Sequence, residues 1–348
     1  MSHSAAPTPA PPATVPQLAL REHRPTDPRW RGDLLAPSSH GRLVPEAVPA
    51  NEPAAAEPPL PAAAPSPRPE PRAARGATPA GPADDLAAEL AREALGDFAP
   101  ALLLLPAIER SRVRALLAYA GTLLGCAGEH GMEGERLAWI GRWEADLDRA
   151  LGGEAGAPPP ICLRMARENA RRRWPLDALD ELAACARQRV LRPRPATAAE
   201  AEADARSLAR AAGGALLEAS LNAEVNGFGG ALIRLHALQH LGAALARGRC
   251  PLPEDEGQGG MDAALGEAVQ RECARLRPRL LRAPRGLIEL PAAYRRAGVF
   301  SLLAGLRLLS EIEEAGAGVL AAPPHLSPAT RIGLLARARW FGMRFGLP

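Results

Sequence analysis

Two spacings in this sequence are typical of metal chemistry. Residues 177–181 read Asp-x-x-Asp-Glu, and His236 and His240 are four residues apart. Residues i and i+4 share one face of a helix, so two histidines at this spacing can bind zinc together. The acids follow Pro175, where the first turn of a helix favours negative charge without any metal. No third ligand accompanies the histidines, which leaves metal binding, lining of a pocket and ordinary packing as alternatives for them.

A second kind of candidate is a site for an anion. Arg110, Arg112 and Arg114 lie at the start of an apolar stretch, residues 103–129, and all 42 basic residues of the chain are arginine. Arginine binds phosphate through a planar fork of N–H donors. These three side chains form either an anion site or a solvated basic edge. The Gly-rich segment 226–230 is interpreted as the start of a helix rather than as a nucleotide-binding loop.

The elements that must position these side chains are predicted to be helices. Hydrophobic residues make up 47% of the 348 residues, but aromatic residues only 3%. Alanine and leucine dominate, and both have high helix propensity, whereas the β-branched residues that favour strands are sparse. No segment shows a convincing strand-like alternation. We therefore predict an all-α fold.

Charge and cysteine usage exclude some classes of protein. The formal net charge of +3 gives no general case for nucleic-acid binding. Five scattered cysteines without a Cys-x-x-Cys pair predict buried thiols in a reducing compartment rather than disulfides or a zinc site. No apolar run approaches the roughly 18 residues of a membrane span, and no signal peptide is apparent. We expect a cytoplasmic protein.

The chain divides into a tail and one helical domain. Residues 1–82 contain 20 of the 37 prolines, with Ala, Ser and Glu between them, and are predicted to be disordered. Within this tail, residues 18–35 include Trp30 and several arginines. This segment is either a short interaction motif or an incidental apolar patch. Residues 83–348 are predicted to form the helical domain.

About ten helices are expected in this domain from the spacing of its apolar residues. Ser111 is predicted to cap a helix that runs to Gly128. Another is expected over residues 228–247, after the Gly-rich start. A helix from Met261 is expected to stop before Pro278, because proline disrupts a helix. Ser327 is predicted to cap the last helix.

Five groups of residues, in order across residues 92–342, carry a resemblance to a known family. They are Leu104-Leu105-Pro106 with Arg110, Ala115-Leu116 and Ala118-Tyr119; Arg136-Leu137, Trp139 and Trp143; Thr197, Glu200 and Ala211-Ala212-Gly213-Gly214; Ala237-Leu238-Gln239, Gly248-Arg249 and Leu252-Pro253; and Ile312-Glu313, Gly316, Val319-Leu320, Ser327 and Arg331. This ordered set resembles the squalene/phytoene synthase family. The resemblance implies an isoprenoid-synthase-like bundle of helices.

The resemblance also implies where metal-binding acids would lie. Members of this family hold Mg²⁺ with two facing acidic motifs, and the Mg²⁺ ions hold the diphosphate of the substrate. The first motif position here is residues 124–128, Leu-Gly-Cys-Ala-Gly, with Glu129 beyond it. The second lies between Gln239 and Gly248 and contains no carboxylate. We therefore expect no catalytic residue, no metal site and no cofactor.

The expected function is that of a catalytically inactive binding or assembly protein that keeps an apolar central cavity for an isoprenoid or lipid. Two sets of candidate residues follow from the resemblance. The candidate cavity-lining residues are Tyr119, Leu124, Cys126, His236, Gln239 and His240, and the candidate anion-binding residues are Arg110, Arg114 and Arg249.

Two alternatives remain open at this point. One is an active prenyl transferase that condenses two allylic diphosphates and requires Mg²⁺. The other is an unrelated helical scaffold whose tail recruits partners.

A partner surface is also expected. Residues 134–139 and the Arg-rich C-terminal helix resemble the sub-branch of the family that includes a mitochondrial complex I assembly factor and its bacterial relatives. That helix, residues 331–345, or the tail, is a candidate contact for a protein partner or for a membrane surface. Its leucines fit core packing, whereas Trp340 and Phe345 are harder to bury. A peripheral location at the inner membrane is compatible with this.

Overall fold

The computed structural model describes residues 82–128, 131–154, 156–217, 222–254 and 261–344. All of them belong to one compact unit, Arg75–Pro348. The tail predicted for residues 1–82 and its segment 18–35 fall outside the described residues, apart from Pro82.

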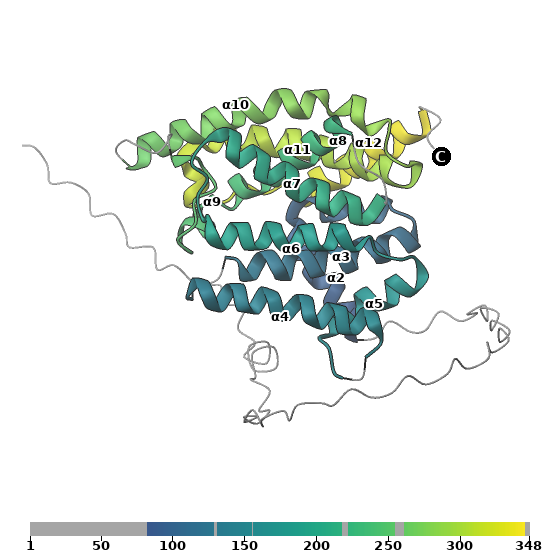
Figure 1. The fold of residues 1–348 in the computed structure, drawn as a ribbon. Helices are drawn as coiled ribbons and strands as arrows, with labels where there is room; N and C mark the ends of the chain where they lie inside the picture. Colours follow the sequence, from purple (N-terminus) through teal and green to yellow (C-terminus); the bar gives the residue numbers. More distant parts are fainter. Residues whose placement is uncertain (1–81, 129–130, 155, 218–221, 255–260, 345–348) are drawn as a thin grey trace, which may run out of the picture. The chain divides into compact units, whose positions relative to one another are not determined.

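The described part of the chain contains helices and no strand, as predicted (Figure 1). Eleven are α-helices and two are 3₁₀-helices. Their bounds are α2 Pro82–Leu95, η1 Gly96–Leu104, α3 Ala107–Cys126, α4 Glu133–Gly152, α5 Pro160–Arg171, α6 Leu176–Leu191, α7 Ala198–Leu217, α8 Ala223–Gln239, α9 Leu241–Leu245, α10 Met261–Leu287, α11 Ala292–Ala315, η3 Gly316–Leu320 and α12 Pro328–Arg344.

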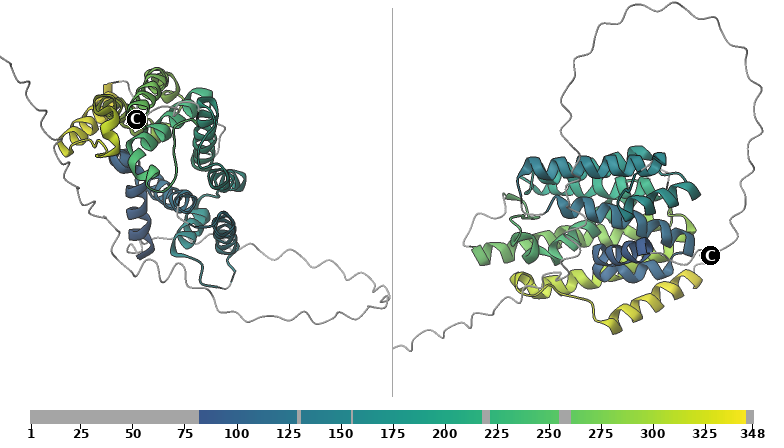
Figure 2. Two further views of the ribbon diagram at one scale, coloured as in Figure 1. Left: turned by 90° about the vertical axis from the view of Figure 1, so that its left-hand side faces the viewer. Right: turned by 90° about the horizontal axis from the view of Figure 1, so that it is seen from below.

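Two large apolar clusters hold these helices together. One cluster includes residues of the six helices from α2 through α7, among them Leu116, Tyr119 and Ile140. The other joins η1 and α8 to α12 and contains Leu235 and Phe300. The helix pairs close a ring, because α3 packs on α7, α7 on α8, α8 on α11, α11 on η1 and η1 on α3. The long helices α4, α6, α7 and α10 run side by side in Figure 1 and appear end-on in the left view of Figure 2.

The predicted cap at Ser111 is wrong. Helix α3 begins at Ala107, directly after the N-cap residue Pro106, so Ser111 lies inside the helix. Its hydroxyl instead donates a hydrogen bond to Glu168 of α5, with 2.7 Å between the oxygens. Glu168 is almost fully buried, and a buried carboxylate needs hydrogen-bond partners. The hydroxyl of Ser111 is one of these partners, so it does not cap a helix.

The helix predicted over residues 228–247 has different bounds. Asn222 caps α8 by accepting a hydrogen bond from the backbone N–H of Val225 at 2.8 Å, so the Gly-rich segment lies inside the helix. A Cβ on Gly229 would lie 2.9 Å from Ala209 of α7. These glycines therefore permit the close approach of α7 and α8 rather than starting a helix. The helix then breaks at His240, and α9 follows.

Pro278 was predicted to stop a helix, but it lies inside one. Helix α10 continues through Pro278 and Pro284 to Leu287. A proline inside a helix costs about 3 kcal/mol, because one backbone hydrogen bond is lost. Leu280 and Leu287 beyond the proline are buried in the apolar cluster, and full burial of each leucine contributes about 1.5–3 kcal/mol. Burial of this second half of the helix thus offsets the cost of the proline.

The last helix is capped as predicted. The hydroxyl of Ser327 accepts a hydrogen bond from the backbone N–H of Thr330 at 3.1 Å. On α12, Leu334 is buried, whereas Trp340 and Phe341 are 49% and 38% exposed. The expected division between buried leucines and an exposed tryptophan is confirmed. Phe345 lies outside the described residues.

Gly242 brings α9 against η3. A Cβ at this position would lie 2.4 Å from the carbonyl oxygen of Leu320, which is backbone and has little freedom to move. We expect Gly242→Ala to lower the free energy of unfolding by about 1–3 kcal/mol, through overpacking. Gly141→Ala in α4 is the matched control, because its Cβ meets nothing within 4 Å. It should be stabilising by about 0.5–1 kcal/mol, through helix propensity.

Chemical denaturation of both variants measures the two changes. Opposite signs at the two glycines are expected. A stabilising Gly242→Ala would contradict the close approach of α9 and η3.

Candidate functional site

The end of α3 meets the segment that follows α9. A Cβ added to Gly128 would lie 2.3 Å from Cζ of Arg249, so the guanidinium lies directly over this glycine. Only glycine leaves room for a side chain in that position. The two stretches to which the resemblance assigns acidic motifs, residues 124–128 and the segment before Gly248, are thus neighbours in space.

Other arginines surround this contact. Nη1 of Arg136, from the first turns of α4, donates to the carbonyl of Ala127 at 3.2 Å. The pKa of Arg249 lies below its ordinary value, first because the side chain is partly buried and then because Arg247, Arg189 and Arg136 are close. Among the described residues, no carboxylate forms an ion pair with any of these four arginines. We call them the arginine cluster.

Arg189, at the C-terminal end of α6, connects the arginine cluster to the histidines of α8. Burial lowers the pKa of Arg189, and its charge in turn lowers the pKa of His236. Cys185 and then Asp204 of α7 raise the pKa of Arg189 in part, and Asp204 forms no ion pair with it in the described part of the chain. Burial raises the pKa of Asp204.

His236 and His240 lie side by side, with 4.5 Å between ring centroids, and His325 is 6.3 Å from His240. Burial lowers the pKa of His236 to about 4, and His240 adds to this effect. Burial also lowers the pKa of His240, followed by the effect of His325. The imidazoles of His236 on α8 and of His240 directly after it are therefore neutral near pH 7. The described residues contain no group of three or more His, Cys, Asp or Glu side chains placed to hold a metal.

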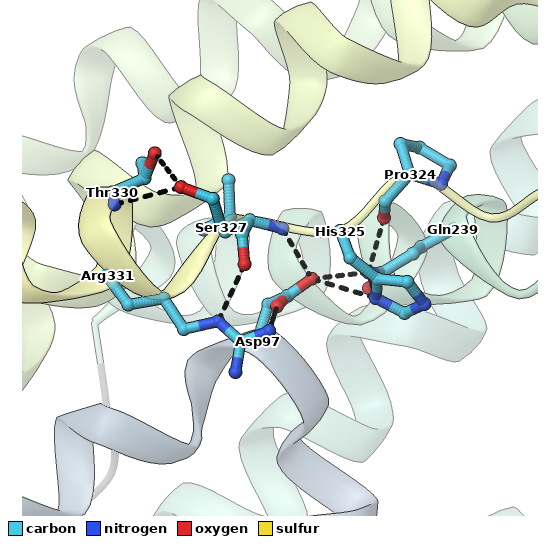
Figure 3. A network of polar contacts seen from close by, with 8 residues as sticks. Asp97, Gln239, Pro324, His325, Ser327, Thr330 and Arg331 are labelled. Carbon is cyan, nitrogen blue, oxygen red and sulfur yellow. Dashed lines mark hydrogen bonds and ion pairs between the residues drawn. The ribbon is translucent and has the colours of Figure 1, made fainter.

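Gln239 is fully buried and belongs to a polar network around Asp97 (Figure 3). Its amide donates to the carboxylate of Asp97 at 2.6 Å and to the carbonyl of Pro324 at 2.8 Å. Arg331 forms an ion pair with the same carboxylate at 2.7 Å, and the backbone N–H of Leu326 lies 3.3 Å from it. Gln239 therefore fastens α8 to η1 and to the segment before α12.

The candidate cavity-lining residues of α3 have different surroundings in the structure. Tyr119 is buried in the cluster of α2 to α7, with its ring stacked 6.1 Å from Trp143. Burial raises the pKa of Tyr119. Leu124 is partly buried against the same cluster. Cys126 is buried at the end of α3, next to the residues that meet Arg249.

The three arginines predicted to bind an anion are not brought together. Arg110 donates to the carbonyl of Leu105 at 2.9 Å near the start of α3. Arg114 lies one turn later and has a lowered pKa, first through burial and then through Arg110. Arg249 contacts Gly128, about 20 Å further along the helix axis at 1.5 Å per residue. Arg112 stacks on Trp174, with its Cζ 3.6 Å from the ring centroid.

The acids of residues 177–181 do not converge on a site. Asp177 and Asp180 are exposed at the start of α6. Glu181 forms an ion pair with Arg210 of α7. This agrees with the interpretation that the first turn of the helix explains them.

The family follows from the match of the chain to known proteins. A family model described as squalene/phytoene synthase matches residues 91–330. The chain belongs to this family. The resemblance to this family is thus confirmed over most of the described chain. The match covers all the helices of the ring.

Solved structures show the same fold. The squalene synthase HpnC from Alicyclobacillus acidocaldarius is 18% identical, with a TM-score of 0.55, over 70% of this chain and 95% of that chain. A dehydrosqualene synthase in complex with ligand is 12% identical, with a TM-score of 0.60, over 75% of this chain and 97% of that chain. A search of curated proteins finds no match. The likeness confirms the isoprenoid-synthase-like bundle.

No described helix is both long and apolar enough to span a membrane.

The resemblance named Arg249, which follows the second motif position, as a candidate for binding an anion. Arg136, Arg189 and Arg247 were not predicted as site residues. Arg136 and Arg189 come from α4 and α6, far from Arg249 in the sequence, and Arg247 is two residues before Arg249 but belongs to no motif that marks it. Asp97 was also missed, since a single acid after Gly96 carries no signal of burial in the sequence.

Proposed function

We propose that this member of the squalene/phytoene synthase family binds an isoprenoid or related lipid without ionising an allylic diphosphate. One observation carries the proposal. The guanidinium of Arg249 lies over Gly128, so a cation occupies the place where the resemblance implies carboxylates and Mg²⁺.

The chemistry of Mg²⁺ supports this proposal. Mg²⁺ takes oxygen ligands in nearly ideal octahedral geometry, usually from one or two carboxylates together with substrate phosphates. Residues 124–128 supply no side-chain oxygen, and residues 240–247 supply none either. The arginine cluster would also repel a divalent cation, because like charges a few ångströms apart interact strongly where water is partly excluded.

The buried acids elsewhere are already committed to arginine partners. The fully buried carboxylates among the described residues are Asp97, Glu168 and Glu272. Asp97 pairs with Arg331, Glu168 with Arg164 and Arg171, and Glu272 with Arg234. A buried ion pair that loses one partner is strongly destabilised. Recruiting one of these acids to a metal would therefore disrupt the fold.

The fold supports an apolar ligand. The chain shares its bundle with solved squalene and dehydrosqualene synthases, and the residues inside its two main clusters are almost entirely aliphatic. A cavity among side chains of this kind would suit a hydrocarbon chain. The isoprenoid nature of the ligand is the step that we propose.

The direct test is incubation of the purified protein with farnesyl or geranylgeranyl diphosphate and Mg²⁺. We expect no release of pyrophosphate above that of a sample without protein, because no carboxylate pair holds the metal. A mass spectrum of lipids extracted from the purified protein should show a bound isoprenoid or lipid.

Two outcomes contradict the proposal. Pyrophosphate release that depends on both protein and Mg²⁺ would establish an active prenyl transferase. The absence of any bound isoprenoid or lipid, together with no binding of added farnesol, would remove the apolar ligand.

A further inference from the structure

We propose that the outer face of α12 docks on a membrane surface that contains anionic lipids. This face consists of Ile332, Ala336 and Trp340 with Arg337 and Arg339. The helix lies in the plane of the lipid head groups, with its apolar side chains toward the acyl chains. The inference goes beyond the proposed function and does not depend on an isoprenoid ligand.

One side of α12 is fixed to the bundle. The helix packs on α11 and on η1, and Leu334 and Ala338 are buried in the apolar cluster that these elements share. Arg331, in the first turn, forms an ion pair with the buried Asp97 of η1. In both views of Figure 2, α12 (yellow) lies at the edge of the bundle. The side of the helix that points away from α11 is therefore available for another contact.

An apolar stripe runs along this available side. Ile332, Ala336 and Trp340 follow one another at intervals of four residues, so they share one face of the helix. All three are exposed, Ile332 to 67% and Trp340 to 49%. With about 3.6 residues per turn, Leu334 and Ala338 fall on the opposite face, in agreement with their burial.

Arginines border the stripe on both sides. The same helical geometry places Arg339 beside Ile332 on one edge and Arg337 beyond Trp340 on the other. Both arginines are exposed, and neither forms an ion pair in the described part of the chain. No Asp or Glu follows Glu314 anywhere in the sequence. The segment that forms α12 therefore carries positive charge without any acidic side chain of its own.

A simpler explanation is that these apolar residues are incidental, because single exposed hydrophobic side chains are common on protein surfaces. Leu176 at the start of α6 is such a case. It is 56% exposed, and the acid Asp177 follows it directly. The outer face of α12 differs, because its apolar residues are aligned and the charges beside them have one sign.

The charge and the shape of this face favour a membrane over a protein as the occupant. Arginine is attracted to anionic head groups and keeps its charged end in water while its stem lies on apolar surface. Tryptophan is enriched at the boundary between lipid and water. A stable protein interface uses about 20–30 residues on each side, whereas this face is the convex side of a single helix. An aligned apolar stripe between arginines is typical of a helix that lies in a membrane surface.

Flotation of the full chain with lipid vesicles tests the inference. We expect the wild type to bind vesicles of phosphatidylcholine and phosphatidylglycerol in equal parts. Binding to vesicles of phosphatidylcholine alone should be much weaker. Added salt should release the protein from the anionic vesicles, because salt screens the attraction between arginines and head groups.

Charge variants locate the contact on α12. Arg337→Gln and Arg339→Gln should each weaken binding to the anionic vesicles roughly fivefold, and the double variant roughly thirtyfold. Arg142→Gln is the matched control, because it removes one exposed arginine from α4. It should bind as the wild type does.

Apolar variants test the stripe. Ile332→Ala should weaken binding roughly three- to tenfold, because less apolar surface enters the lipid. Its side chain is mostly exposed, so the variant is expected to keep the circular dichroism spectrum of the wild type. Leu176→Ala is the matched control and should leave binding unchanged.

Trp340→Phe provides a readout that does not depend on affinity. Lipids brominated on their acyl chains quench the fluorescence of tryptophans that enter the bilayer. We expect both the wild type and Trp340→Phe to bind anionic vesicles, with less quenching in the variant.

Three results would overturn the inference. The first is the absence of wild-type binding to the anionic vesicles, which would assign the outer face of α12 to a protein occupant. The second is a loss of binding in Arg142→Gln or Leu176→Ala as large as in the α12 variants. The third is equal quenching in the wild type and Trp340→Phe, which would place the membrane contact on another surface.

Discussion

Asp97→Ala is expected to lower the free energy of unfolding by about 3–5 kcal/mol, the cost of breaking a buried ion pair by removing one partner. The carboxylate of Asp97 is fully buried and forms an ion pair with Arg331 of α12. It also accepts from the amide of Gln239 on α8. Both donors lose the carboxylate in the variant and keep backbone carbonyls, Gln239 that of Pro324 and Arg331 that of Leu326. Gln239 has no access to water. The loss is a large fraction of the roughly 5–15 kcal/mol that stabilises a typical domain.

Hydrogen exchange locates the effect, because Asp97 of η1 bonds to Arg331 of α12 and to the backbone of Leu326 just before that helix (Figure 3). Amides of α12 should exchange faster in Asp97→Ala at a denaturant concentration that leaves the rest of the fold protected. Asp97→Asn keeps one acceptor and should fall between the wild type and Asp97→Ala. Glu89→Ala removes an exposed acid of α2 and should stay within about 0.5 kcal/mol of the wild type.

A loss of less than about 1 kcal/mol in Asp97→Ala, or unchanged exchange in α12, would show that the network does not hold that helix.

Helix content and order could be predicted from the sequence, because apolar spacing and capping residues are local signals. Ser327 shows this, since it caps the last helix as predicted. The errors came from tertiary packing. Pro278 lies inside α10 because the leucines beyond it are buried. Ser111 lies inside α3, where its hydroxyl donates a hydrogen bond to the buried carboxylate of Glu168 on α5.

The candidate site was less predictable than the fold. The resemblance named Arg249 and placed the end of α3 at the centre of the chemistry, and the structure brings these two segments into contact. The other members of the arginine cluster come from α4, from α6 and from the turn after α9, where Arg247 is two residues before Arg249. The proximity of Arg136 and Arg189 to Arg249 depends on how the bundle closes, which no spacing in the sequence records. In a chain whose 42 basic residues are all arginine, residue type alone cannot single them out.

Glu272→Ala should also lower the free energy of unfolding by about 3–5 kcal/mol. The expected cause is the buried charge that is left without a partner, and not the loss of attraction between two charges. Glu272 on α10 is 1% exposed, and its carboxylate lies 2.5 Å from Nε of Arg234 on α8, whose side chain is 8% exposed. The variant leaves the guanidinium of Arg234 buried without its carboxylate. On the same helix, Glu267 pairs with Arg271 in water, so Glu267→Ala is the matched control and should cost no more than about 0.5 kcal/mol.

The double variant Arg234→Met with Glu272→Leu distinguishes the two contributions. Removal of both charges leaves neither member of the buried pair without its partner, and apolar side chains of similar size fill the space between α8 and α10. Arg275, which also pairs with Glu272 at 3.6 Å, has a side chain that is 37% exposed to water. Replacements of this kind are often neutral or stabilising, so we expect the double variant to lie within about 1 kcal/mol of the wild type despite the large loss in Glu272→Ala. Denaturation of the wild type, Arg234→Met, Glu272→Leu and the double variant completes the cycle. If the double variant is as unstable as Glu272→Ala, the attraction between the charges, and not the cost of leaving one unpaired, stabilises the contact of α8 with α10.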